Sequence, residues 1–318
     1  MPDRRIVFHL IGNAHLDPVW LWDWREGLNE GLITSRTLLD LMDEDPELTL
    51  TRGEASLYDH IERTDPETFE RIRRRVREGR WEVVGGNWVQ PDTNLPATET
   101  FARQFLRGQR YFASRFGKPV TVAWAADSFG HAAGLPEILS AAGFRGFCFT
   151  RPNNRLLPLP KPAFWWEGPG GARLLACRSL YGSYTMERDG ILRKLDGLLE
   201  AAMKCDLRNF AVFYGLGNHG GGPTRRHLDE IRDWRSRHPE VEVVFSGLHR
   251  LIEALHREAA EGGPDYLPVH RGEMNFCLRG CYSSVARFKF FYRRTEAHLF
   301  RAERTAAAVA AATGEEAG

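Results

Sequence analysis

The chain has 318 residues, of which 42% are hydrophobic and 27% are charged, and its formal net charge is +1. This composition is typical of a soluble globular protein, and the near-neutral charge argues against a nucleic-acid or anionic-membrane partner. No apolar run approaches the roughly 20 residues that cross a bilayer, and the N-terminus lacks the apolar core of a secretory signal. Because the cysteines are scattered and odd in number, we expect no disulfide framework and a cytoplasmic location.

Short apolar runs alternate with longer amphipathic stretches along most of the chain. The runs predict β-strands at 4–11, 48–52, 81–86, 120–125, 146–150, 172–177, 210–215 and 241–246. The stretches predict helices at 29–43, 54–78, 97–115, 132–142, 192–204, 224–237 and 248–261. This alternation favours a parallel α/β sheet, open or closed, that is buried on both faces. From about residue 284 the pattern changes to one long helix, and no predicted strand follows it.

Polar residues follow several of these strands directly. His15 and Asp17 follow the first strand, Asp127 follows the fourth, and a glycine-rich loop with His219 follows the seventh. In parallel α/β folds, the carboxyl ends of the strands form the edge where sites are built. Imidazole and carboxylate ligands suit Zn²⁺ or a similar divalent ion. Taken alone, however, the first pair also fits a strand end with a capping aspartate, and Asp127 also fits the N-cap of the next helix.

The loop "GLGNHGGG" at 215–222 contains five glycines in eight residues. Such a loop allows the backbone to approach a ligand closely. It lacks the spacing of a P-loop or a dinucleotide fingerprint, so we expect it to shape a site around His219 without binding phosphate. Tryptophans are dense near the predicted strand ends, and indole rings there can stack against the apolar faces of sugars.

Four segments in order resemble glycoside hydrolase family 38, the α-mannosidases: "HLIGNAHLDPVWLWDWREG", "GRWEVVGGNWVQPDTNLPATETFARQFLRGQRYF", "AWAADSFGHAAGLPEIL" and "GNHGGGPTRRHLDEI". A fifth segment near the end of the chain, "GEMNFCLRGCYSSVARFKFFYRRTEAHL", resembles that family's passage from the catalytic domain into a helical domain. The resemblance implies a seven-stranded β/α barrel of the glycoside hydrolase/deacetylase type at 1–275. It also implies the start of a helical domain at 276–318, without the family's C-terminal β-rich domains.

The resemblance further implies a metal-dependent glycosidase that removes terminal α-linked mannose from oligosaccharides or glycosides. One divalent metal is implied, usually zinc, with cobalt and manganese as alternatives. His15 and Asp17 would bind it, while Asp127 would be both ligand and nucleophile of a retaining mechanism. The residues expected to bind substrate are Trp20, Trp22, Trp88, Asp92 and Asn218.

The sequence departs from the family pattern in two places. Many members have a metal-binding histidine before the helical domain, but none occurs here between Gly272 and Gly280. Many members also have an acid/base aspartate in the glycine-rich loop, where this chain has Asn218, which cannot transfer a proton. One hypothesis is that His219 serves either as the fourth metal ligand or as the acid/base. Asp92 is the other candidate for the proton donor.

Two alternatives stay open at this point. A mannoside-binding relative without turnover would also explain the missing acid/base aspartate. A metal-dependent polysaccharide deacetylase is less favoured, because it needs a separate base, often in an Asp-Asp pair, and none lies beside Asp127. The linkage preference and any homo-oligomer are not determined by the sequence.

Overall fold

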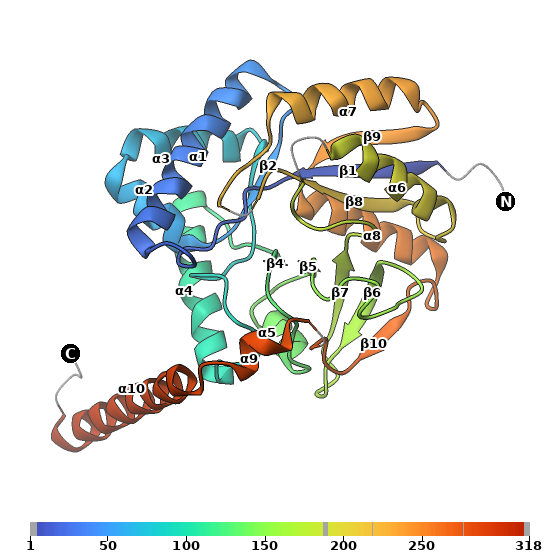
Figure 1. Cartoon of the computed structure of the whole chain (residues 1–318). Coiled ribbons are helices and arrows are strands. Elements are labelled where there is room, and N and C mark those ends of the chain that lie inside the picture. Colours follow the sequence, from blue (N-terminus) through green and yellow to red (C-terminus); the bar gives the residue numbers. More distant parts are fainter. Residues whose placement is uncertain (1–4, 187–189, 218, 276, 315–318) are drawn as a thin grey trace.

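The computed structural model describes residues 5–186, 190–217, 219–275 and 277–314. Its strands are β1 (Ile6–Gly12), β2 (Leu50–Arg52), β3 (Trp81–Val83), β4 (Val122–Ala125), β5 (Gly146–Phe149), β6 (Ala163–Glu167), β7 (Arg173–Arg178), β8 (Asn209–Tyr214), β9 (Val241–Ser246) and β10 (Val269–Arg271). Its helices are α1 (Trp24–Glu44), α2 (Ala55–Thr64), α3 (Pro66–Arg77), α4 (Thr98–Phe116), α5 (Leu135–Ala141), α6 (Ile191–Met203), α7 (Arg225–Arg237), α8 (Leu248–Gly262), α9 (Arg279–Ser283) and α10 (Ala286–Thr313). The strands lie in the interior and most helices lie around them (Figure 1).

The strands form three sheets, in the orders β8-β1-β9, β2-β3 and β10-β6-β7-β5-β4. Neighbouring strands are parallel except β6 and β7, which pair antiparallel. Single contacts join the sheets: Asn13 forms a parallel bridge with Thr51 beyond the end of β1, and the Gly85 amide donates to the Val122 carbonyl at 2.9 Å. The first contact places the carboxyl end of β1 beside β2, and the second joins the segment after β3 to the start of β4.

The prediction of an α/β fold built on parallel strands is confirmed, and β1 and β8 are buried along most of their length. A closed seven-stranded barrel, in contrast, is not formed by the described residues. Both β2 and β3 are only three residues long, so their ladders are too short to close the sheets into one continuous barrel. The additional strands β6 and β10 also make the largest sheet a mixed one.

The helix expected at 54–78 is divided into α2 and α3 at Asp65. Pro66 lacks an amide proton and therefore begins α3, while the carboxylate of Asp65 accepts the Thr68 amide at 3.1 Å as an N-cap. The other predicted helices are observed with small shifts at their ends. In the part of the chain that the structure describes, no helix is both long enough and apolar enough to cross a bilayer.

The long C-terminal helix α10 extends away from the body of the molecule (Figure 1). It contacts the start of α4, where the Glu296 carboxylate accepts the Ala97 amide at 2.8 Å and Arg103 pairs with Glu303. Several of its aromatic side chains are exposed, including Phe288, Phe290 and Phe291.

Candidate metal and active site

The loop after β1 carries His15 and Asp17, and close packing holds it against α1. Gly27 of α1 permits this approach, because a Cβ atom there would lie 2.3 Å from the Pro18 carbonyl oxygen. The indole Nε1 of Trp22 donates to the Asp17 carbonyl at 2.9 Å, which closes the loop on itself. The backbone around the two candidate ligands is therefore fixed from both sides.

Asp127 lies two residues after the end of β4. The preceding residue is anchored, because the Ala126 amide donates to Oε1 of Gln90 at 3.2 Å. The alternative that Asp127 caps the next helix is wrong: α5 begins only at Leu135, and Gly134 is its N-cap. The Asp127 side chain therefore does not cap the N-terminus of a helix and is available to the site.

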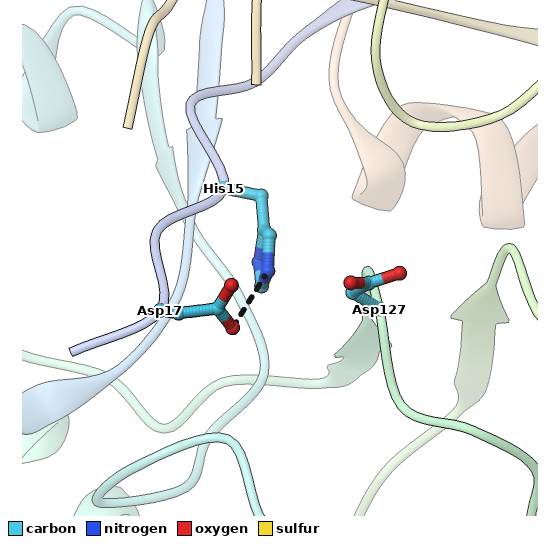
Figure 2. Close-up of side chains that lie close together, drawn as sticks. All are labelled: His15, Asp17 and Asp127. Carbon is cyan, nitrogen blue, oxygen red and sulfur yellow. Dashed lines mark ion pairs between the residues drawn. The ribbon is translucent and has the colours of Figure 1, made fainter. Parts of the chain in front are cut away.

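Three side chains converge where these two loops meet. Figure 2 shows the imidazole of His15 between the carboxylates of Asp17 and Asp127. One ligand atom from each residue lies within 4.8 Å of the other two. His15 Nε2 is 3.4 Å from Asp17 Oδ1, and it is buried with no hydrogen-bond partner among the described residues.

This arrangement fits a divalent metal. A buried ring nitrogen without a partner is costly, and coordination would compensate that cost. One imidazole and two carboxylates are ligands that zinc accepts, and they leave room for further ligands. The cluster is therefore the candidate metal site, with His15, Asp17 and Asp127 as the residues that would hold the ion.

Two further residues reach the cluster from segments that the sequence analysis did not single out. Arg151, just after β5, donates from Nε to Oδ1 of Asp127. The ring of Tyr184 packs edge-on against His15 with centroids 4.8 Å apart, and its carbonyl accepts from Asn13 Nδ2 at 2.9 Å. Burial and then the charge of Asp127 raise the pKa of Tyr184, so its hydroxyl stays a neutral donor beside the cluster.

His219 is not brought into the three-residue cluster. Its ring stacks on Trp22 with centroids 3.7 Å apart and an interplanar angle of 5°, and its Nε2 lies 3.4 Å from Oε1 of Glu26. A backbone bridge to Leu16 nevertheless keeps the glycine-rich loop beside the metal-site loop. A role for His219 as ligand or acid/base stays a prediction. Asn218 lies outside the described residues.

The predicted substrate-binding residues have different surroundings. Trp20 is 57% exposed and meets Trp22 edge-on at 5.6 Å, so both indoles flank the loop of the cluster. Trp88 is instead half-buried, with the Arg107 guanidinium 3.8 Å from its ring centroid. Asp92 is exposed, and its Oδ1 accepts the amides of Asn94 and Leu95 at 2.8 and 3.0 Å, which stabilises its own turn.

The cluster lies within a segment that matches a known family. The model for "Glycosyl hydrolases family 38 N-terminal domain" matches residues 5–273. The chain is 31% identical over 271 residues to Alpha-mannosidase 2C1 of Homo sapiens, which covers 84% of this chain and 26% of that protein. It is 30% identical over 311 residues to Alpha-mannosidase of Saccharomyces cerevisiae, which covers 93% of this chain and 28% of the yeast protein. The chain thus spans about a quarter of the length of these relatives.

A solved structure agrees with the sequence comparison at the level of the fold. The crystal structure of an alpha-mannosidase from Enterococcus faecalis V583 superposes with a TM-score of 0.73 at 20% identity, over 85% of this chain and 31% of that one. The matched family segment includes His15, Asp17 and Asp127 and most of the described fold. The chain therefore belongs to glycosyl hydrolase family 38.

Proposed function

We propose that this chain is the catalytic part of a retaining, divalent-metal-dependent α-mannosidase that removes terminal α-linked mannose from oligosaccharides or glycosides. The observation that carries the proposal is the convergence of His15, Asp17 and Asp127 from two strand ends far apart in sequence. The relatives named above as α-mannosidases support the choice of sugar.

Each residue of the cluster has a separate task in this mechanism. His15, Asp17 and Asp127 would hold the divalent metal, which would act as a Lewis acid toward the bound sugar. Asp127 attacks the anomeric carbon while the glycosidic C–O bond breaks, and the leaving oxygen takes a proton from the general acid. Water, deprotonated by the same group, then displaces Asp127 from the glycosyl-enzyme, so configuration is retained. Arg151 holds Oδ1 of Asp127 in place through its Nε donor. Trp20 and Trp22 provide aromatic surface beside the cluster.

For His219 the observed contacts favour proton transfer over metal ligation. The Nε2 atom pairs with Glu26, and the ring is held flat against Trp22, so neither contact directs a nitrogen to the metal cluster. An imidazole that is oriented by a carboxylate is a common arrangement for a general acid/base. We therefore assign the acid/base role to His219 within this proposal.

The proposal is tested by hydrolysis of an aryl α-D-mannoside. The protein is stripped of metal, reconstituted with Zn²⁺ or Co²⁺, and compared with Asp127→Asn. A matched control is Asp229→Asn, because Asp229 is exposed on α7. We expect turnover that depends on the metal, is retained by the control and is lost with Asp127→Asn. A folded protein that binds mannosides without turnover with either metal would instead establish the binding-only alternative.

A further inference from the structure

Glu54, between β2 and α2, occupies an unusual backbone position. Its φ of 72° lies in the left-handed region, which residues other than glycine rarely adopt. Although Glu54 is the N-cap residue of α2, its carboxylate makes no capping hydrogen bond. A common reason for an acidic side chain at the start of a helix is therefore missing. Strained residues of this kind concentrate at functional sites.

Glu54 lines a small cavity beside the metal cluster. The cavity measures about 20 Å³, and its wall includes Asn13, His15, Arg52 and Trp124. Two residues of this wall, apart from His15, have a polar atom that is buried without a hydrogen-bond partner among the described residues: Asn13 Oδ1 and Arg52 Nη2. A polar cavity of this size is large enough for one water molecule.

The charges around the cavity are complementary. Arg52 is only 4% exposed, and no ion pair within 4.0 Å is found for it or for the Glu54 carboxylate in the described ranges. His15 and Arg52 share the wall of the cavity with Glu54. Burial raises the pKa of Glu54, the positive charges of His15 and Arg52 lower it, and the Asp17 carboxylate raises it. A buried guanidinium is far better tolerated when a carboxylate faces it across a bridging water molecule.

We propose that Glu54 is a positioning residue of the metal site, whose carboxylate and one water molecule in the cavity fix the orientation and basicity of the His15 imidazole. This inference rests on the proposed function, because it assumes that His15 binds the metal. A carboxylate behind a metal-binding histidine typically contributes 10–100-fold to metal affinity. The backbone strain at Glu54 is then retained because the side chain must enter the cavity.

The test is the affinity for Zn²⁺, measured by competition with a chromophoric chelator, for Glu54→Gln and Glu54→Gly. Both variants should bind zinc at least about tenfold more weakly than the parent protein. Glu67→Gln is the matched control, since Glu67 is exposed in the first turn of α3, and its affinity should not change. Activity of Glu54→Gln should recover when the zinc concentration is raised.

Thermal unfolding of the metal-free proteins separates positioning from a structural role. Both variants lose the carboxylate that faces Arg52, but glycine adopts a positive φ without strain, so Glu54→Gly should melt at a higher temperature than Glu54→Gln while both bind zinc more weakly. Zinc affinities within twofold of the parent for both variants would overturn the inference and leave the proposed function standing. If the parent protein itself binds no zinc, the metal site of the proposed function fails and this inference fails with it.

Discussion

The substitution Gly27→Ala tests how the fold positions the metal-site loop. An added Cβ would lie 2.3, 2.9 and 3.1 Å from the backbone O, C and Cα of Pro18, whereas ordinary contacts begin at 3.4 Å. Pro18 must therefore retreat by about 1 Å, and Asp17 must move with it. A displacement of about 1 Å at a reacting centre costs on the order of 100-fold in rate. Overpacking lowers the free energy of unfolding by about 1–3 kcal/mol, and the better helix propensity of alanine offsets about 1 kcal/mol of this loss.

We thus expect Gly27→Ala to lose at most about 2 kcal/mol of unfolding free energy but about 100-fold of kcat/KM. The assays are urea unfolding of the metal-free protein and hydrolysis of an aryl α-D-mannoside, together with the zinc affinity. Gly280→Ala is the control, because a Cβ at this helical position in α9 meets no atom within 4 Å. Unchanged zinc affinity and unchanged kcat/KM in Gly27→Ala would refute the claim that α1 fixes the loop.

Two further predictions concern single side chains. His219→Ala should keep the parent's zinc content and lose turnover, as measured by metal analysis of the dialysed protein and by mannoside hydrolysis; reduced zinc content would restore the ligand role. Lys194 is buried, and its Nζ donates to the Ser183 carbonyl at 2.6 Å. Burial lowers the pKa of Lys194 from 10.5 to about 7, so the folded state binds fewer protons than the unfolded state between these values. Stability should therefore rise from pH 7 to pH 10 by up to about 1.4 kcal/mol per unit, and this contribution should be absent from Lys194→Met. The measurement is the free energy of unfolding in urea at several pH values for both proteins. The same pH dependence in the parent protein and in Lys194→Met would contradict the prediction.

The sequence predicted the local elements well, because their signals are local. The alternation of apolar runs and amphipathic stretches identified β1 to β5 and β7 to β9 to within a few residues. The strand β6 was missed because its aromatic run follows several prolines, and β10 because it has three residues and is largely exposed. The break at Pro66 is also a local signal, because proline lacks an amide proton and therefore begins a helix.

In the site too, local patterns in the sequence predict what neighbouring residues do, but not which distant residues meet. His15 and Asp17 are two positions apart at a strand end, so the sequence alone suggested a joint role. Their approach to Asp127 depends on strands more than a hundred residues away, whose register no local pattern encodes. Arg151 could have been noticed as a charged residue directly after a strand, but Tyr184 lies in a loop without any such signal.

The sequence by itself thus determined the family, the alternation of strands and helices, and the residue types able to hold a metal. Only the tertiary structure decided which of these side chains meet. It placed His219 against Trp22 and Glu26 and brought Arg151 and Tyr184 to the cluster. It also placed Glu54 and His15 in the wall of one small cavity. The physical reason is that the direction of a side chain depends on backbone dihedrals and on packing between distant segments, which spacing along the chain does not specify.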